Sequence, residues 1–342
     1  MKVTVTDFLN VRVGKASLNA PTYQYLAPGT ILEVEDATYN GDVFEGSNQW
    51  LKDKAGNYYW AGATTYSVAG IINPACYDAW HLKDYKIKAL HDKGLNGQGT
   101  TICIVDSGIV ATHPGFDYTK ISGKGFMDQV ITNDYKDDHG HGTECAGITS
   151  ANGKKVLGIA FEANLRAFKG YSNISSEEVD MICAIENIPL DVDVVSISYV
   201  FVDVKLLDRM TRAISRLINA NIIVIAAHGN TDTPPNLLSS IPGVISVGAV
   251  DEKGQYAPYT CKNGTFTVLA PGVNIQTTNK TGYTTDTGTS FAAPFVAAIF
   301  ALLRQTDKTF SPAQALEYIN NNHTFSKDGS KKIIDPSAIL KF

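Results

Sequence analysis

The sequence predicts a small all-β barrel followed by an α/β domain with a doubly wound, mostly parallel sheet. Its 342 residues are enough for about two domains. The first 68 residues contain short β-prone runs without helical periodicity, whereas the rest alternates between strand and helix patterns. We therefore divide the chain into a barrel at 1–68, a linker at 69–75 and an α/β domain at 76–342.

The barrel prediction rests on three runs that are separated by Gly, Asn and Asp turn residues. They are ILEVEDATY at 31–39, VFEGSNQWLKDK at 43–54 and NYYWAGA at 57–63. Strands of this length and spacing are typical of a small barrel. Four aromatic residues in these runs either form a peptide groove or fill the core, and both interpretations remain open: Trp50, Tyr58, Tyr59 and Trp60.

The α/β prediction rests on apolar runs suited to buried parallel strands. These runs lie at 100–106, 164–170, 191–198, 221–227 and 243–250. Between two of them, 204–220 carries an apolar stripe at helical spacing, which makes a βαβ unit. Near the end, Ser311 and Pro312 are a typical N-cap and first residue for a helix over 311–322.

Charge and hydropathy exclude two classes of partner. The formal net charge of -5 gives no basic face, so we expect no nucleic-acid partner. No apolar run approaches the roughly 18 residues of a membrane span, so we expect no membrane partner. No cofactor is predicted either.

The cysteines and the N-terminal stretch bear on the cellular compartment. The five cysteines are scattered, without zinc-site spacing or disulfide-scaffold density, so we expect buried reduced thiols. The stretch MKVTVTDFLNVRVGK has a lysine but no following apolar region, unlike a signal peptide. We expect a cytoplasmic protein, or an extracellular one if a leader has been removed from the sequence.

Three short motifs in the α/β part carry acid–base or nucleophilic side chains. Asp106 ends the run TICIVD, at the edge where reactive groups gather in parallel sheets. The cluster DDHGHGTECAG at 137–147 holds His141, and Ser290 begins a long apolar helix. Each motif alone has an ordinary explanation, because Asp caps turns, Ser caps helices, and a His–Cys pair can be half of a metal site.

Taken together, IVDSG, GHGTECAG and GTSFAAPFVA resemble the subtilisin-like serine proteases in order and local sequence. The resemblance covers about residues 76–342. It implies a serine endopeptidase with Asp106, His141 and Ser290 as its triad, an acyl-enzyme intermediate, and protein or peptide as substrate. AAHGN resembles the segment that carries the family's oxyanion asparagine, which maps to Asn230.

The same resemblance implies that the substrate contacts Ser198, Tyr199, Gly229 and Thr289. SYVF at 198–201 stands where the family has glycines beside the substrate backbone, so the width of the cleft is not predicted. TDTPPNLLSSIPG, which follows Asn230, is shorter than the family's usual pocket wall. An apolar residue before the scissile bond is the default expectation.

Within the histidine cluster, the resemblance assigns a single base. Cys145 follows His141 by four residues, on the same helical face, and is expected to be a small buried residue behind it. His139 is expected at the rim of the cleft. No second Cys/His cluster supplies the three or four protein ligands that zinc generally takes, so no metal site is predicted.

Calcium is also not expected. Secreted relatives commonly hold a structural calcium, but Gly115 stands here where an acidic ligand would fall, with Asp117 nearby. The loop 149–158 is shorter than the family's, offers no carboxylate and carries Lys154 and Lys155. Calcium takes about six to eight oxygen ligands, usually including carboxylates.

The N-terminal part carries a resemblance of its own. LNVRVG at 9–14, PGTILEV and WLKDKAGNYYWAGA resemble the bacterial SH3-like domain. This implies a domain that binds a protein or peptide ligand, recruits substrate or covers the cleft. The alternative function is an inactive subtilisin-like scaffold that binds peptide or protein through this domain, although the intact triad and Asn230 argue against it.

Overall fold

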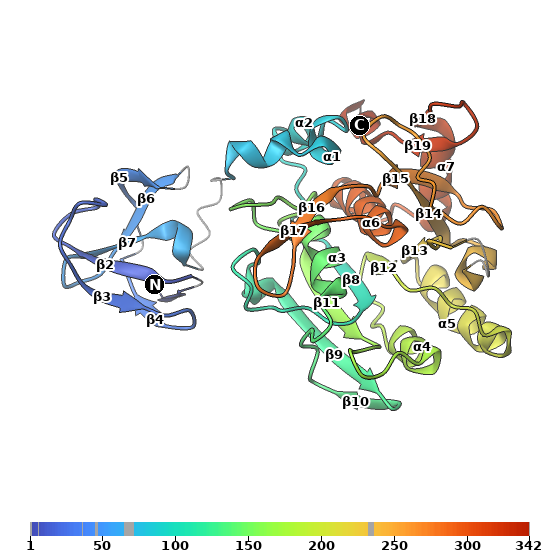
Figure 1. Ribbon diagram of the computed structural model, residues 1–342, viewed down its shortest axis with the longest axis horizontal. Coiled ribbons are helices and arrows are strands. Elements are labelled where there is room, and N and C mark those ends of the chain that lie inside the picture. Colours follow the sequence, from blue (N-terminus) through green and yellow to red (C-terminus); the bar gives the residue numbers. More distant parts are fainter. Residues whose placement is uncertain are drawn as a thin grey trace.

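The computed structural model describes residues 2–5, 7–35, 37–44, 47–64, 72–231 and 236–341. The chain folds into two groups of elements (Figure 1), and the buried apolar residues of each group form separate cores. One core consists of buried residues between Val3 and Ala63, and the others contain residues from Cys76 onward. The division into two parts therefore has a physical basis in packing.

The N-terminal part is all β. A five-stranded antiparallel sheet has the order β3-β2-β7-β6-β5, and β1 pairs with β4 in a second small sheet. This arrangement is compatible with an SH3-like domain. The strands are β1 (Lys2–Thr4), β2 (Leu9–Val13), β3 (Thr22–Leu26), β4 (Ile31–Glu33), β5 (Tyr39–Phe44), β6 (Ser47–Lys52) and β7 (Asn57–Trp60).

Most of the aromatic residues considered for a peptide groove belong to the core of this part. Tyr58 is half-buried, with its ring 5.6 Å from that of Tyr39. The other three are buried: Trp50, Tyr59 and Trp60. A cavity of about 390 Å³ is lined by Trp50 and Trp60 from this set and by three exposed rings: Phe8, Tyr25 and Phe44.

The C-terminal part is built on a ten-stranded sheet of the order β10-β9-β11-β8-β12-β13-β14-β15-β19-β18. From β9 to β19 along this order, neighbouring strands are parallel. The edge strands β10 and β18 are antiparallel to their neighbours. The strands are β8 (Thr101–Asp106), β9 (Ile121–Met127), β10 (Val130–Thr132), β11 (Asn164–Lys169), β12 (Val194–Ile197), β13 (Ile223–Ala227), β14 (Ile245–Val250), β15 (Val268–Pro271), β18 (His323–Phe325) and β19 (Lys332–Ile334). A separate hairpin pairs β16 (Ile275–Thr278) with β17 (Tyr283–Asp286).

Helices cover both faces of this sheet (Figure 1). Side chains of β8 alternate between two cores: Ile102 and Ile104 pack with α3 and α6, whereas Cys103 and Val105 pack with α4 and α5. This three-layer arrangement confirms the predicted doubly wound α/β fold. The helices are α1 (Trp80–Lys83), α2 (Ile87–His91), α3 (His141–Ser150), α4 (Glu178–Glu186), α5 (Leu207–Asn219), α6 (Thr289–Thr306) and α7 (Pro312–Asn321).

The predicted elements of the α/β part match observed ones. The five apolar runs contain β8, β11, β12, β13 and β14, and 204–220 contains α5. Helix α7 begins after Ser311, whose hydroxyl accepts a hydrogen bond from the Gln314 N–H at 3.2 Å. The Gln314 side chain accepts in return from the Ser311 N–H at 2.8 Å, which completes a capping box.

Helix α6 is the long apolar helix that was predicted at Ser290. Its 18 residues have a mean hydropathy of 1.2, which is enough by length and composition to cross a membrane. In the fold, 83% of this stretch is buried, against α3 and the sheet. The expectation that no apolar run approaches 18 residues is thus corrected, and α6 is the central core helix of the α/β part.

Part of the predicted linker, 69–75, makes contacts with the α/β part. Residues 69–71 lie outside the described residues. The Asn73 N–H already donates to the carbonyl oxygen of Gly153 at 2.9 Å, and a 3-10 helix begins at Pro74. Contacts of the α/β part therefore start before the predicted boundary at residue 76.

Candidate active site

Asp106 is positioned by the end of β8. This strand lies between β11 and β12, where the strand order reverses, and such switch points form the binding crevices of open α/β sheets. Asp106 is fully buried. Its Oδ1 accepts hydrogen bonds from the Ser107 N–H at 2.7 Å and the Tyr171 hydroxyl at 2.8 Å.

His141 is the first residue of α3 and faces Asp106. Its Nδ1 lies 2.8 Å from Asp106 Oδ1 and 3.0 Å from Oδ2. A carboxylate can only accept, so Nδ1 carries the proton and Nε2 is the nitrogen that can take another. Gly140, at a φ of 118°, turns the chain into the helix through a backbone conformation that favours glycine.

Burial and charge act in opposite directions on this pair. Burial would raise the pKa of Asp106, but the neighbouring His141 and the hydrogen-bond donors outweigh it and hold that pKa below its usual range. Burial would lower the pKa of His141, but the Asp106 carboxylate raises it well above its usual value. The pair therefore stabilises a positive charge on the imidazole, as a general base requires after it has taken a proton.

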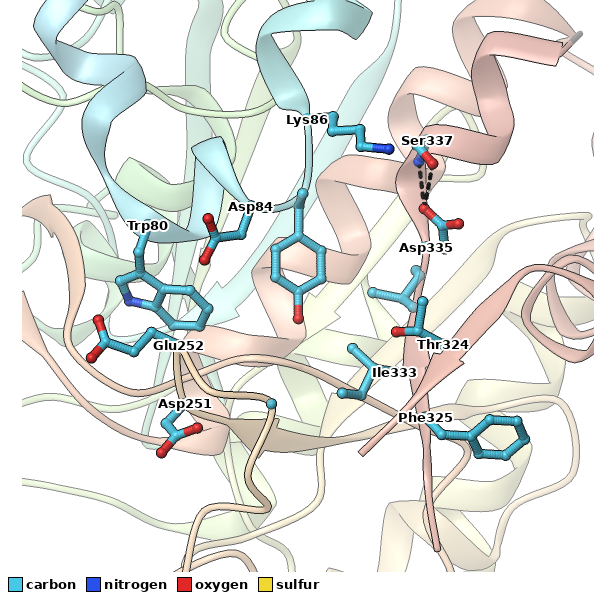
Figure 2. A pocket seen from close by; sticks show the side chains of 13 residues that line it. Trp80, Asp84, Lys86, Asp251, Glu252, Thr324, Phe325, Ile333, Asp335 and Ser337 are labelled. Carbon is cyan, nitrogen blue, oxygen red and sulfur yellow. Dashed lines mark hydrogen bonds between the residues drawn. The ribbon is translucent and has the colours of Figure 1, made fainter. Parts of the chain in front are cut away.

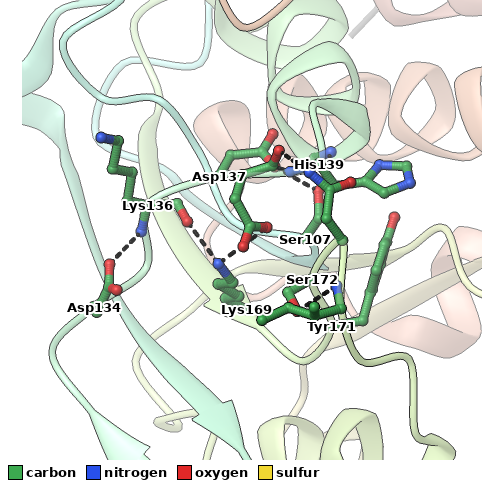
Figure 3. A network of polar contacts seen from close by, with 12 residues as sticks. Ser107, Asp134, Lys136, Asp137, His139, Lys169, Tyr171 and Ser172 are labelled. Atoms are coloured by element: carbon green, nitrogen blue, oxygen red, sulfur yellow. Dashed lines mark hydrogen bonds and ion pairs between the residues drawn. The ribbon is translucent and has the colours of Figure 1, made fainter.

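The first carboxylate of the histidine cluster caps α3. Asp137 is buried, and its Oδ1 accepts from the Gly140 N–H at 2.8 Å and the Ser107 hydroxyl at 2.9 Å (Figure 3). Its Oδ2 accepts from the N–H and hydroxyl of Thr143, at 2.9 and 2.6 Å. These bonds satisfy donors at the helix start and fix the helix that carries His141. This role of Asp137 was not predicted, although an acidic residue just before a helix is a usual capping signal.

Ser290 lies in the first turn of α6, and a proline four residues later determines its surroundings. Pro294 has no N–H, so the Ser290 carbonyl lacks its usual intrahelical hydrogen bond. Cys145 Sγ at 3.3 Å and the Ser198 hydroxyl at 2.9 Å donate to it instead. Cys145 Sγ also lies 3.8 Å from His141 Nδ1. One sulfur atom thus adjoins both the backbone of Ser290 and the imidazole.

Cys145 is a buried structural thiol. Burial raises its pKa to about 11, and its S–H is donated to the Ser290 carbonyl. Nucleophilic attack and metal ligation both require the thiolate. Asp106, His141 and Cys145 hold ligand-type atoms within 4.8 Å of one another, the one such triple found among the described residues. Since the Nδ1 proton and the S–H already serve hydrogen bonds, this set fits a hydrogen-bond network better than a cation.

All five cysteines are buried and free, as predicted from their spacing.

Asn230 follows β13 after a turn at Gly229, whose φ is 116°. Asn230 Oδ1 accepts from the Thr289 N–H at 2.8 Å and from the Thr289 hydroxyl at 2.9 Å. The Gly229 N–H in turn donates to that hydroxyl at 3.1 Å. Because its carbonyl end is held, the exposed Asn230 side chain presents its NH₂ group as a donor beside the start of α6. Such a donor can stabilise negative charge on a reacting oxygen.

Three of the four residues expected to contact substrate are buried, and their contact with substrate remains a prediction. Thr289 and Gly229 are buried, and their polar groups bond within the protein. Ser198 is also buried, with its hydroxyl on the Ser290 carbonyl. The hydrogen bonds of these three residues thus lie within the framework that holds Ser290 and Asn230. Tyr199 is half-buried, with its ring 5.7 Å from that of Tyr171.

The bulky residues at 198–201 do not all face the cleft. Phe201 is fully buried in the core beneath α4 and α5, with its ring 5.0 Å from that of Tyr199. The Asn236 amide donates to the Tyr199 carbonyl at 3.0 Å and holds this segment to the chain beyond Asn230. In the expected pocket wall after Asn230, residues 232–235 lie outside the described residues.

Two further titratable groups adjoin His141. Burial, together with the nearby Asp286, raises the pKa of Glu144 to about 7. His139 is exposed, with its ring 6.3 Å from that of His141 and 5.4 Å from that of Tyr171, which agrees with the expected place at the rim. Glu144 therefore acquires its negative charge near neutral pH, close to the imidazole.

A cavity of about 320 Å³ lies elsewhere, beside α1 and the β18–β19 pair (Figure 2). None of the predicted site residues lines it. Its polar side chains include Asp84, Asp251, Glu252 and Asp335. Asp335 is already bonded to the N–H and hydroxyl of Ser337, at 2.9 and 2.7 Å. The predicted catalytic residues therefore gather at the Asp106 site and not in this cavity.

The absence of a calcium site at 149–158 remains a prediction. The Asn152 N–H and amide donate to the carbonyls of Gly115 and Pro114, at 2.8 and 2.9 Å, so they close the loop without a carboxylate. We expect the same melting temperature in calcium-saturated protein and in excess chelator, measured by calorimetry. A drop of several degrees in chelator would show that carboxylates elsewhere hold calcium.

Comparison with known sequences gives a consistent assignment. A family model described as "Subtilase family" matches residues 97–335. The minor extracellular protease Epr of Bacillus subtilis (strain 168) is 34% identical over 254 residues, which are 72% of this chain and 38% of Epr. Subtilisin E of the same organism is 31% identical over 257 residues, which are 71% of this chain and 65% of subtilisin E. The chain thus spans less than two thirds of the length of either relative.

Solved structures share the fold. A cold adapted subtilisin-like serine proteinase superposes with a TM-score of 0.62 at 22% identity, over 70% of this chain and 89% of that one. A protease from Pseudoalteromonas arctica PAMC 21717 superposes with a TM-score of 0.66 at 19% identity, over 78% of this chain and 98% of that one. At these identities the likeness bears on the fold alone.

Proposed function

The chain belongs to the subtilase family, and on this premise we propose that it is a serine endopeptidase acting on protein or peptide substrates. The observation that carries the proposal is the buried pairing of His141 Nδ1 with Asp106 Oδ1 at 2.8 Å. Cys145 links this pair to the backbone of Ser290. A hydroxyl, a base and an orienting carboxylate are the groups that acyl transfer needs.

In the proposed reaction, the Ser290 hydroxyl attacks the scissile carbonyl while His141 Nε2 takes its proton. His141 then gives this proton to the departing amine, the C–N bond breaks, and an ester joins Ser290 to the acyl half. Water, deprotonated by the same imidazole, then attacks the ester. His141 returns this proton to the Ser290 oxygen as the ester C–O bond breaks and the acid product leaves. Asp106 holds the imidazole in place and stabilises its positive charge in both halves of the reaction.

Negative charge develops on the carbonyl oxygen during each attack. We assign its stabilisation to the Asn230 NH₂ group and the Ser290 N–H. In subtilisin, loss of the oxyanion asparagine slows turnover by about 10²- to 10³-fold. The two bonds from Thr289 to Asn230 Oδ1 support this assignment, because they orient the amide before substrate arrives.

A fluorophosphonate probe tests the proposed nucleophile directly. In the full chain it should label Ser290, and the Ser290→Ala variant should remain unlabelled. A folded chain that is never labelled would instead favour the inactive scaffold, in which the N-terminal domain binds peptide or protein.

We propose in addition that the SH3-like part recruits substrate or a partner and takes no part in the chemistry. Its core is separate from those of the α/β part. A fragment starting near residue 70 retains the Asn73 contact and should hydrolyse a small peptide ester at least as fast as the full chain. A fragment that is unfolded or inert would make this part a folding aid, and circular dichroism distinguishes the two outcomes.

A further inference from the structure

Tyr171 adds a hydrogen-bond donor to the Asp106–His141 pair. It lies two residues beyond β11, and its hydroxyl is 2.8 Å from Asp106 Oδ1 and 3.0 Å from His141 Nδ1. Since Nδ1 donates its own proton to the carboxylate, the hydroxyl can donate only to Asp106. Burial, reinforced by Asp106, raises the pKa of Tyr171 above its ordinary value, so the hydroxyl keeps its proton.

We propose that Tyr171 is a positioning residue of the triad, whose hydroxyl fixes the orientation of the Asp106 carboxylate against the imidazole. The inference rests on the proposed function of this site. Nothing in the triad chemistry itself calls for this hydroxyl, because attack, proton transfer and oxyanion stabilisation are assigned to other groups.

The geometry explains how the hydroxyl acts. Asp106 Oδ1 accepts a hydrogen bond from the Ser107 N–H in its own turn, at 2.7 Å. It accepts another, at 2.8 Å, from the hydroxyl of Tyr171 in the segment that follows β11. Two donors from different segments hold this oxygen and so restrict rotation of the carboxylate. The Tyr171 ring is itself held between His139 and Tyr199, at centroid distances of 5.4 and 5.7 Å.

The same bond affects the charge that His141 experiences. A donor on the carboxylate draws off part of its negative charge, and so weakens its pull on the imidazolium. The other titratable groups around the pair come from several elements: Cys145 and Glu144 on α3, His139 and Asp137 before it, and Asp286 at the end of β17. Of these, Glu144 titrates near neutrality and needs a control.

The test is Tyr171→Phe in the full chain, which keeps the ring and removes the hydroxyl. The acid limb of the pH profile of kcat/KM should move to higher pH by about half a unit. At pH values below the limb, kcat/KM should therefore fall about threefold. The plateau kcat should fall about three- to tenfold through poorer orientation, with KM nearly unchanged. Both changes should persist in a Glu144→Gln background.

A second readout does not depend on turnover. The low-field proton NMR signal of His141 Nδ1–H, recorded in the full-length Ser290→Ala protein, should shift and exchange faster after Tyr171→Phe. An unchanged acid limb together with an unchanged signal, or a change in KM alone, would make Tyr171 a wall of the cleft and overturn the proposal. If the signal responds but the parent chain, with Ser290 intact, hydrolyses no substrate, the positioning role stands and the proposed function fails.

Discussion

Replacing Ser290 with alanine should abolish nearly all peptidase activity while the fold persists. In subtilisin, loss of the nucleophile costs about 2 × 10⁶ in kcat, and we expect a loss of this order here. The fold should tolerate the change because the bonds from Cys145 and Ser198 go to the backbone carbonyl of Ser290, which alanine retains. Single-turnover kinetics and the melting temperature measure the two effects separately.

Cys145→Ala is the matched control for that variant. It removes one of two donors to the Ser290 carbonyl and a buried sulfur, so stability should fall by about 1 to 3 kcal/mol. Most of the activity should remain, since the thiol is protonated and not the attacking group. The opposite pattern, or inactivation by thiol alkylation at Cys145 alone, would refute the serine mechanism.

Most residues of the five sheet strands predicted from the sequence are buried, although the equally buried β15 was not predicted. The runs that became β8, β11, β12, β13 and β14 are apolar because helices cover both sides of the sheet. Strand β9 was missed because ISGKGFM contains glycines where that pattern expects large apolar residues. A Cβ on Gly123 would lie 2.2 Å from the Ala167 carbonyl oxygen, so close strand packing rather than periodicity determines this position.

In the site, likewise, some residues were predicted from a local sequence motif and others are identified only by their tertiary contacts. Asp106, His141 and Ser290 each sit in a short motif, so their order along the chain was enough to nominate them. Tyr171 is 65 residues from Asp106 in the sequence, and no local sequence pattern indicates their hydrogen bond. Thr289 was predicted only as a substrate contact, and the bond from its hydroxyl to Asn230, which lies 59 residues earlier, was not predicted. Roles that depend on tertiary contact became visible only in the fold.

Asp106→Asn should lower kcat by about 10⁴-fold, the loss seen when the triad aspartate of a serine protease is changed in this way. The structure explains the size of this effect. Ser107 N–H and the Tyr171 hydroxyl both donate to Oδ1, so an asparagine would place its carbonyl oxygen there and its NH₂ group at the Oδ2 position. The NH₂ group, 3.0 Å from His141 Nδ1, would replace an acceptor with a donor, and the imidazolium would lose the negative charge that stabilises it. The tautomer with its proton on Nε2, which is no base for Ser290, then becomes favourable.

The same geometry predicts that the Tyr171 hydroxyl still matters in Asp106→Asn. Oδ1 is the carboxylate oxygen nearer to His141 Nδ1, at 2.8 Å, so the hydroxyl holds the amide oxygen where Nδ1–H can donate to it. In Asp106→Asn with Tyr171→Phe, only the Ser107 N–H still holds this oxygen, so the amide can turn its NH₂ group to that position in a fraction of molecules. We expect kcat of the double variant to be several-fold lower than that of Asp106→Asn. Steady-state rates for the four proteins form the test, with melting temperatures to confirm folding. A double variant as fast as Asp106→Asn would show that the Tyr171 hydroxyl does not hold the amide, and an Asp106→Asn variant within tenfold of the parent would remove the triad assignment of Asp106.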